Sequence, residues 1–261
     1  MVRTAKLKTG KNLSLKSYIR RLSNSVAPEK RMSADALSSL DTALSNKIKG
    51  LLQSSIAAAD NCKKHTVGSK EGKIAVDAMF SPDYAKKLNA KALAALDKYT
   101  ATRPAKVDSG KKKKKSPKKK GKASSLGSKA GLILSVARVR NLAKSILPMY
   151  TRTKTDKATN KPVQEQAQMR ITTPALVYLT GVAEELLSGV LKSSSQVSDE
   201  LKKKTIMPKA IYGGLVRDKD LFVAFSDYIH SNLGEVREEV KQVLEKALTP
   251  KKKGKKTAKG R

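Results

Sequence analysis

The 261-residue chain has no tryptophan, only three phenylalanines and a single cysteine, Cys62. Proteins that bind single-stranded nucleic acid stack bases on aromatic side chains, so this scarcity argues against such a binder. A lone cysteine forms neither a disulfide framework nor a Cys-x-x-Cys metal site, which is typical of a reducing compartment. The histidines, His65 and His230, lie far apart and without cysteine neighbours. We therefore expect polar surface or loop histidines and no metal site.

Acidic residues are also scarce. The 22 Asp and Glu stand against 56 Lys and Arg, which gives a formal net charge of +34. A sequence isoelectric point near 10.2 is the electrostatic signature of a nucleic-acid binder. No apolar run approaches the roughly 20 residues needed to span a bilayer, and the N-terminus has no signal-peptide core. The composition therefore predicts a soluble nucleic-acid-binding protein with no membrane partner.

Motifs of catalysis are missing as well. No glycine-rich phosphate loop follows a strand, and the Gly-Ser-Lys at 68–70 lacks the rest of a P-loop. Glu184 and Glu185 lie together on a predicted long helix, where exposure to solvent is the ordinary state of a carboxylate. We expect no enzyme, no cofactor and no small-molecule substrate.

A run of lysines, SGKKKKKSPKKKGKASS at 109–125, is the most prominent feature that is present. Such a run cannot be buried and repels itself, so it predicts a solvated segment. Taken alone, it is also compatible with a solubility tail or an import signal. The run divides the chain into two halves, and both halves follow one plan.

The first half has a short, a long and two further helical patterns. A short helix is predicted at 14–27, and Pro28 stops it. Ser33 then caps the long helix. Helices at 68–80 and 82–100 complete this half. The apolar stripe of the long helix recurs at spacings of three and four over about eight turns. It consists of Leu37, Leu40, Leu44, Ile48, Leu51, Leu52 and Ile56.

The second half repeats the order. A first helix is predicted at 131–147 and a polar loop at 149–170. Thr172 and Thr173 are then expected to cap a second long helix. A third helix is expected at 207–216. No strand-like alternation is sustained in either half, so the sequence predicts an all-α protein. The second long stripe consists of Leu176, Leu179, Ala183, Leu186, Leu187, Val190 and Leu191.

A long helix flanked by short ones forms a poor globule, because its apolar stripe outruns its partners. Crossing the two long helices in antiparallel directions buries both stripes at once. That pairing places the loop after one first helix beside the loop after the other long helix. Each end of the pair is then expected to present two basic loops together.

Several stretches resemble the core histones. In the first half KKHTVGSKEGKIAV and AKKLNAKALAALDKYT are similar to histone 2B. In the second half KAGLILSVARVRNLAK, RITTPALVYLTGVAEELL and KKKTIMPKAI follow histone 2A in order. The resemblance covers about residues 17–102 and 128–245. A fused 2B–2A doublet is similar to those encoded by large DNA viruses of amoebae.

The resemblance implies two histone folds that pair as an intramolecular handshake. It divides the chain into a basic N-terminal tail at 1–13, a 2B-like fold at 14–102, a Lys-rich linker at 103–127, a 2A-like fold with a docking segment at 128–248 and a basic C-terminal tail at 249–261.

The function that the resemblance implies is structural. Histones wrap double-stranded DNA by neutralising phosphates and by inserting arginines where the minor groove faces inward, without reading bases. The implied partner is a histone 3/histone 4-type tetramer or doublet, with two copies of each chain per particle. The implied location is chromatin in a nucleus, or a viral factory and virion. A generic basic protein, for example an RNA-associated one, would explain the charge but not the repeated helical plan.

The family's DNA-contacting positions can be transferred one by one. Arg138 matches a first-helix arginine, and Arg170 matches the loop arginine that enters the minor groove. Thr205 stands where the family has an arginine, and its hydroxyl can reach a phosphate but cannot enter a groove as a cation. The expected DNA-binding residues are Arg20, Arg21, Arg31, Ser33, Lys63, Lys64, Thr66, Arg138, Arg140, Lys144, Arg170, Lys203, Lys204 and Thr205.

Two family interfaces are expected to be weakened. The carboxylate patch that binds nucleosome factors is reduced to Asp83, Glu184, Asp218 and Asp220, with Gly189 and lysines at other matching positions. Where the family's long helix contacts the histone 3/histone 4 partner through a leucine and an aromatic residue, this chain has Ala58 and Asn61. The docking segment at 234–248 has helical apolar spacing in place of an extended strap.

Overall fold

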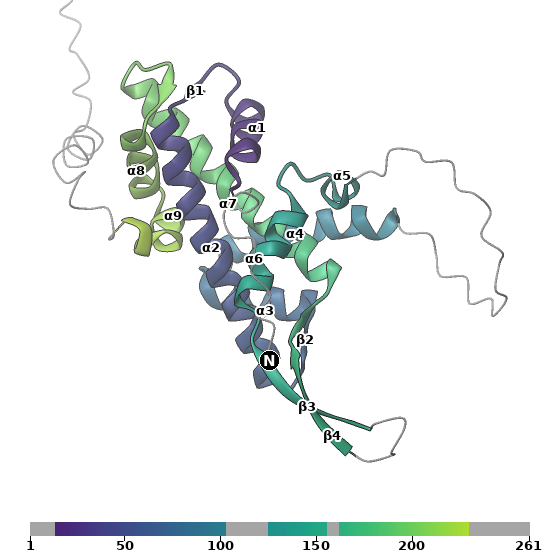
Figure 1. Cartoon of the computed structure of the whole chain (residues 1–261). Helices are drawn as coiled ribbons and strands as arrows, with labels where there is room; N and C mark the ends of the chain where they lie inside the picture. The colour runs from purple at the N-terminus through teal and green to yellow at the C-terminus, as the bar shows by residue number, and fades with distance from the viewer. Residues whose placement is uncertain (1–13, 103–124, 156–161, 230–261) are drawn as a thin grey trace, which may run out of the picture.

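The computed structural model describes residues 14–102, 125–155 and 162–229, and its architecture is mostly helical, as the sequence predicted (Figure 1). The helices of the first half are α1 (Lys16–Val26), α2 (Ala34–Asn61), α3 (Ser69–Met79) and α4 (Pro82–Ala101). Those of the second half are α5 (Leu126–Ala130), α6 (Val136–Ile146), α7 (Thr173–Glu200), α8 (Pro208–Arg217) and α9 (Lys219–Ala224). The strands are β1 (Arg31–Met32), β2 (Thr66–Val67), β3 (Met149–Thr155), β4 (Pro162–Gln168), β5 (Arg170–Ile171) and β6 (Thr205–Ile206).

The two halves repeat at a constant spacing. The long helices α2 and α7 begin at residues 34 and 173 and end at residues 61 and 200, and both differences are 139. The same difference separates β1 from β5 and β2 from β6, since 170 − 31 and 205 − 66 are also 139. The stretch from β1 to β2 in the first half therefore has the same length as the stretch from β5 to β6 in the second.

Equivalent caps define the ends of the long helices. The Ser33 hydroxyl accepts a hydrogen bond from Ala36 N at 3.2 Å, and the Thr172 hydroxyl accepts one from Ala175 N at 3.2 Å. Both helices are followed by a lysine in the left-handed region, Lys63 with φ 53° and Lys202 with φ 54°. A left-handed residue reverses the chain after a helix, and this role usually falls to glycine.

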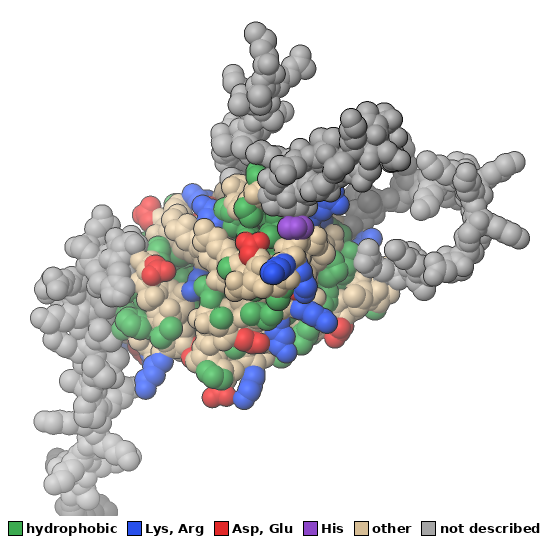
Figure 2. Space-filling view, turned by 90° about the horizontal axis from the view of Figure 1, so that it is seen from below, with side chains coloured by type: hydrophobic (Ala, Val, Ile, Leu, Met, Phe, Trp, Pro, Cys, Tyr) green, Lys and Arg blue, Asp and Glu red, His purple; other side chains and the backbone are tan. Residues whose placement is uncertain are grey.

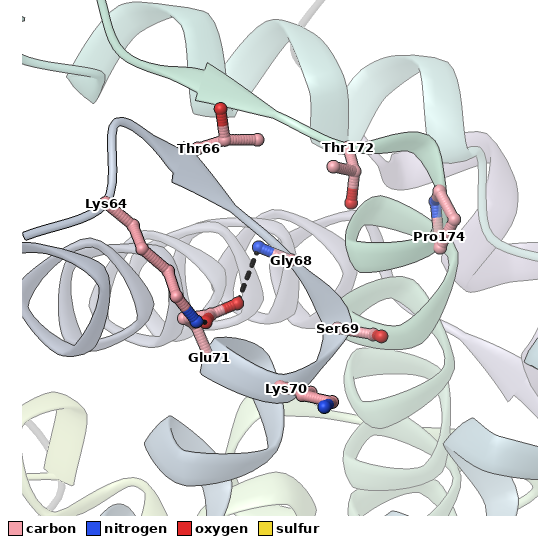
Figure 3. A pocket seen from close by; sticks show the side chains of 8 residues that line it. All are labelled: Lys64, Thr66, Gly68, Ser69, Lys70, Glu71, Thr172 and Pro174. Carbon is pink, nitrogen blue, oxygen red and sulfur yellow. Dashed lines mark hydrogen bonds and ion pairs between the residues drawn. The ribbon is translucent and has the colours of Figure 1, made fainter. Parts of the chain in front are cut away.

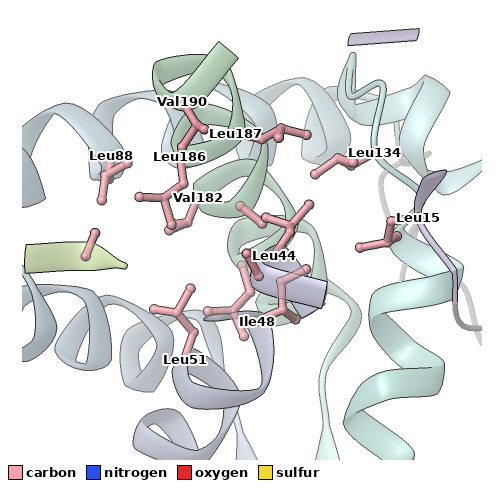
Figure 4. Packing of buried hydrophobic residues seen from close by; sticks show 14 of the residues in the cluster. Leu15, Leu44, Ile48, Leu51, Leu88, Leu134, Val182, Leu186, Leu187 and Val190 are labelled. Carbon is pink, nitrogen blue, oxygen red and sulfur yellow. The ribbon is translucent and has the colours of Figure 1, made fainter. Parts of the chain in front are cut away.

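The first and second halves pack into one core. Helix α2 contacts α6 and α8 of the second half, and α7 contacts α1, α3 and α4 of the first. Leu44 and Ile48 from α2 lie near Leu186 and Leu187 from α7, and all four are at most 1% exposed (Figure 4). Removing such leucine side chains from water stabilises the fold by about 1.5–3 kcal/mol each. The apolar stripes of both long helices are therefore buried in a core that residues of both halves form.

Two short parallel strand pairs join the halves at opposite ends of the long helices. Strand β1, before α2, pairs with β6, after α7. Strand β2, after α2, pairs with β5, before α7. The start of each long helix therefore lies beside the end of the other, and the two helices run antiparallel.

The prediction of a polar loop at 149–170 is wrong, because most of this segment forms a β-hairpin. Strands β3 and β4 pair antiparallel from Met149 opposite Gln168 to Thr155 opposite Pro162, and they project from the helical body (Figure 1). Both strands read as polar sequence, MYTRTKT and PVQEQAQ, so the apolar alternation that identifies most strands is missing. The hairpin has no counterpart in the first half, where only residues 27–30 separate α1 from β1.

Other boundaries also differ from the predictions. The first helix of the second half begins at Val136, not at residue 131, because Gly131 has φ 68° and ends the short α5 instead. By length and composition α7 is apolar enough to cross a membrane, with a mean hydropathy of 1.3 over its most apolar window. The expectation that no such run exists was therefore wrong, although 78% of that window is buried inside this protein. The proposed docking helix at 234–248 lies outside the described residues.

Candidate nucleic-acid interface

The first loop pair joins β1 to β6 and presents cations from both halves. Arg31 lies opposite Thr205, and Arg31 N donates a hydrogen bond to the carbonyl oxygen of Lys204 at 3.0 Å. The side chains of Arg31, Lys203 and Lys204 are exposed, whereas Thr205 is half-buried. The structure thus brings four of the expected DNA-binding residues together at one end of the long helices.

Lys30, which was not among the expected residues, connects the two loops of this pair. Its ammonium donates to the carbonyl oxygen of Lys203 at 2.8 Å and forms an ion pair with Asp199. The Lys30 side chain is only 12% exposed, so its charge is committed to this contact. The equivalent position in the second half is Met169, which is buried against Ile56 and its neighbours. One loop pair is therefore tied by an ion pair and the other by an apolar cluster.

The second loop pair joins β2 to β5 and borders a shallow pocket of about 540 Å³ (Figure 3). Thr66 lies opposite Arg170, whose side chain is exposed. The pocket is lined by Lys64, Thr66, Gly68, Ser69, Lys70, Glu71, Thr172 and Pro174. The N-termini of α3 and α7 both contribute to this lining. At α7, Pro174 has no N–H and Ala175 N already donates to the Thr172 hydroxyl, so the N–H groups that favour an anion come from the start of α3. The site can therefore receive a phosphate group.

Glu71 reduces the positive charge of this pocket by pairing with Lys64. Its carboxylate accepts from Gly68 N at 2.8 Å and from the Lys64 ammonium at 2.6 Å (Figure 3). The hydrogen bond from Lys64 holds the pKa of Glu71 below its usual value, and the same bond raises the pKa of Lys64. Lys64 is thus ionised and oriented, but its ammonium is already paired with the Glu71 carboxylate. The equivalent position after β6 holds Ala210, so the two ends differ in this respect.

The third cluster lies where the N-terminal ends of α1 and α6 meet. The Arg138 guanidinium donates to Ser14 O and lies 5.4 Å from the centre of the Tyr18 ring, and Arg21 lies 5.8 Å from the same ring. Hydrogen bonding to Ser135 and the charge of Arg138 lower the pKa of Tyr18. Arg138 therefore joins the two halves as well as adding charge to their surface.

The remaining expected residues fall into two groups. Arg140 is half-buried and donates to the Thr173 hydroxyl at 3.2 Å, so it supports the start of α7. The exposed cations are Arg20, Lys63 and Lys144. Ser33 is half-buried, and its hydroxyl serves as the cap of α2.

The expected acidic patch needs a correction at Glu184. This residue is only 5% exposed, and its carboxylate accepts from Ile133 N at 2.6 Å and from Leu134 N at 2.9 Å. Burial raises its pKa, while these two backbone bonds act in the opposite direction. Glu184 therefore anchors the segment before α6 and is not available to a partner.

Other acidic residues do gather near Tyr84. Burial raises the pKa of Tyr84, and the charges of Asp218, Glu185 and Asp220 raise it further. Asp218 caps α9 through Leu221 N at 3.2 Å, and Asp220 accepts from the Ser81 hydroxyl at 2.7 Å. Glu185 was not among the expected patch residues. The fourth expected member, Asp83, is 97% exposed and pairs with Lys86 at 3.4 Å.

The surface is not uniformly basic. Figure 2 shows one face on which Lys and Arg side chains are scattered among acidic and apolar groups. On this face the described body therefore has mixed charge. Among the described residues no three His, Cys, Asp or Glu side chains come together to hold a metal ion. A scan against models of protein families and a search of curated proteins find no match to this chain.

Proposed function

We propose that this chain is a structural chromatin protein, a fused histone 2B–2A doublet that wraps and compacts double-stranded DNA. Its two short–long–short helical units are histone folds, paired as a handshake within one chain. The observation that carries the proposal is the pair of equivalent loop contacts, Arg31 opposite Thr205 and Arg170 opposite Thr66, at opposite ends of two antiparallel helices.

The physical mechanism is electrostatic. Exposed Lys and Arg neutralise phosphates and release counterions, which gives affinity without sequence reading. The N-terminus of α3 beside Ser69 supplies N–H donors for a phosphate group. Arginine side chains enter the minor groove where it faces the protein, as in other proteins that bend DNA.

The dimensions suit a bent duplex. A helix of 28 residues, the length of α2 and of α7, is about 42 Å long. That length exceeds one turn of B-DNA, which is about 34–36 Å. A duplex that contacts both loop pairs would therefore follow the protein for about one turn or more.

The proposed particle contains two copies of this chain and two of a histone 3/histone 4-type partner. Such particles would serve as chromatin in a nucleus, or package a viral genome in a viral factory and virion. The alternative is a generic basic nucleic-acid binder, for example an RNA-associated protein. The net charge of +34 fits either function, whereas the repeated loop pairs favour the histone.

Micrococcal nuclease digestion separates the two functions. The chain is reconstituted on long duplex DNA with a histone 3/histone 4-type partner, and polylysine serves as the control for generic charge. A discrete protected length that polylysine does not give supports wrapping. A continuous smear from both samples contradicts it.

A further inference from the structure

Helix α9 has apolar side chains on its outer surface. It lies beside α8 at one side of the helical body (Figure 1). Leu221 and Ala224 are at most 3% exposed, whereas Phe222 is 38% exposed and Val223 is 61% exposed. Adjacent exposed apolar side chains mark a contact surface more often than isolated ones do. We call Phe222 and Val223 the α9 patch.

The last described residues are held against the body directly after α9. Phe225 and Ile229 are each 4% exposed. Between them, Tyr228 stacks on Tyr212 of α8, with ring centres 5.6 Å apart and ring planes within 3° of parallel. The Tyr212 hydroxyl donates to the Tyr228 hydroxyl at 3.3 Å. The point at which the chain leaves the described body is therefore fixed and lies within a few residues of the α9 patch.

The sequence that follows has the pattern of an amphipathic helix. Asn232 with Glu235 three residues later is a helix-start signature, and Pro250 ends the pattern. A helix of this length is marginal in water unless its apolar face is packed. The apolar stripe recurs at helical spacing and consists of Val236, Val240, Val243 and Leu244.

We propose that residues 234–248 form a helix whose apolar stripe packs on the α9 patch of the same chain. Residues 230–233 form the turn, and a connection of this length is typical of two adjacent antiparallel helices. Four residues span up to about 14 Å, which is enough to bring the stripe beside α9. The short connection makes the contact intramolecular, at roughly millimolar effective concentration or above.

The composition of the segment favours this occupant over a second chain. Glu238, Gln242 and Glu245 lie opposite the stripe on a helical projection, so only one face of the helix is suited to burial. The segment and the α9 patch each have one apolar face to cover, and covering one covers the other.

This inference goes beyond the proposed function and does not rest on it. The resemblance implies a segment that docks on the histone 3/histone 4-type partner. A stripe that is packed on α9 is not available to that partner. The contact also requires neither DNA nor a second protein, so it can be tested on the chain alone.

Amide hydrogen exchange of the full chain in high salt, without DNA or partner, is the first test. Exchange at 234–248 should be slowed by at least about tenfold relative to an unstructured chain of the same sequence. Phe222→Ser/Val223→Ser should abolish this protection. Unchanged protection of α7 in that variant checks that the body remains folded. The matched control, Ile74→Ser/Leu93→Ser, replaces two apolar side chains outside α9 that are 50% and 41% exposed, and it should leave 234–248 protected.

A second test leaves the α9 phenylalanine intact and identifies the face that makes the contact. In a Cys62→Ser background, Val223→Cys is combined in turn with Val236→Cys, Val240→Cys or Val243→Cys. Because a disulfide requires Cα atoms within about 7 Å, at least one of these pairs should cross-link within the monomer on mild oxidation. Val223→Cys/Gln242→Cys is the matched control from the opposite face, and it should cross-link more slowly.

The outcomes separate this inference from its alternatives. Equal cross-linking by the stripe and by Gln242→Cys, an unprotected segment in the unaltered chain, or protection that survives Phe222→Ser/Val223→Ser would each overturn it. Disulfide-linked dimers in place of cross-linked monomers would assign the α9 patch to a second copy. Protection that appears only when the histone 3/histone 4-type partner is added would assign the segment to that partner. In that case the inference is wrong and the proposed function stands, whereas a failed nuclease protection assay would contradict the proposed function alone.

Discussion

Replacement of Glu184 should reveal how strongly α7 holds the segment that leads into α6. The Glu184 carboxylate accepts two backbone hydrogen bonds, from Ile133 N at 2.6 Å and Leu134 N at 2.9 Å, at a site that is 5% exposed. Glu184→Ala leaves both donors without this acceptor. A buried donor that loses its partner costs about 1–3 kcal/mol, so we expect a loss of about 2–4 kcal/mol in unfolding free energy.

Glu184→Gln isolates the effect of charge. The amide oxygen can accept both bonds, but the side chain no longer ionises. Burial raises the folded-state pKa of Glu184 above its ordinary value of 4.5, so folding favours the protonated form. The stability that this shift contributes is fully present below pH 4.5 and is lost as pH rises through the folded-state pKa. The stability of Glu184→Gln relative to the unaltered chain should therefore increase from pH 4 to pH 7.

Denaturant unfolding in high salt, followed by circular dichroism at both pH values, measures these differences. The matched control is Glu185→Gln, which alters a half-buried carboxylate on the next residue of α7. It should change stability by less than Glu184→Ala. A Glu184→Ala cost below about 1 kcal/mol would mean that the two N–H groups find other acceptors. A difference between Glu184→Gln and the unaltered chain that falls with pH would refute burial as the dominant influence on this carboxyl.

Further expectations concern packing, salt and assembly. Gly214→Ala should destabilise the fold by about 1–3 kcal/mol, because its Cβ would lie 2.7 Å from Ser194 N on α7. The control Gly50→Ala should not destabilise it, because its Cβ would meet only Met79 Cε at 3.7 Å. Equal melting temperatures for the two variants would contradict the close approach of α8 to α7. Lys30→Met should make thermal stability less sensitive to salt by removing the ion pair behind the first loop pair, and an unchanged salt dependence would argue against that tie. Sedimentation in high salt should give a folded monomer, and an obligate domain-swapped dimer would contradict intramolecular pairing. In a reconstituted particle this chain should dissociate at lower salt than cellular histones 2A and 2B, and release at equal or higher salt would show that the partner contact is not weakened.

The long helices were predictable because their signals are local and repeated. Ser33 and Thr172 are strong caps, and the apolar residues that follow recur at helical spacing for many turns. The adjacency of the loops could also be anticipated, because two long stripes bury each other best when antiparallel. The strand register could not, since it depends on backbone bonds such as Arg31 N to Lys204 O that leave no trace in composition.

The features that were missed depend on tertiary contacts. Glu184 was expected at the surface because carboxylates usually lie there, but the bend at Gly131 brings two N–H groups to it. Lys30 resembles an ordinary loop lysine until Asp199 is placed beside it by the fold. The β3–β4 hairpin has polar residues on both strands, so no apolar periodicity distinguished it from a loop.

The Lys-rich connection between the halves could act in two ways: it could hold the folded halves together, or it could bring them together while the chain folds. Helices α4 and α5, at the two ends of the Lys-rich segment, pack against each other, and one apolar cluster contains residues from both halves. Cleavage of the backbone between residues 103 and 124 would therefore leave a nicked complex that remains folded and associated. The peptide connection would matter chiefly before that state is reached, because it gives each half a partner at roughly millimolar effective concentration while the chain folds. Continuity of the chain would then determine how quickly and with whom the halves pair, and the interface would determine how long they stay together.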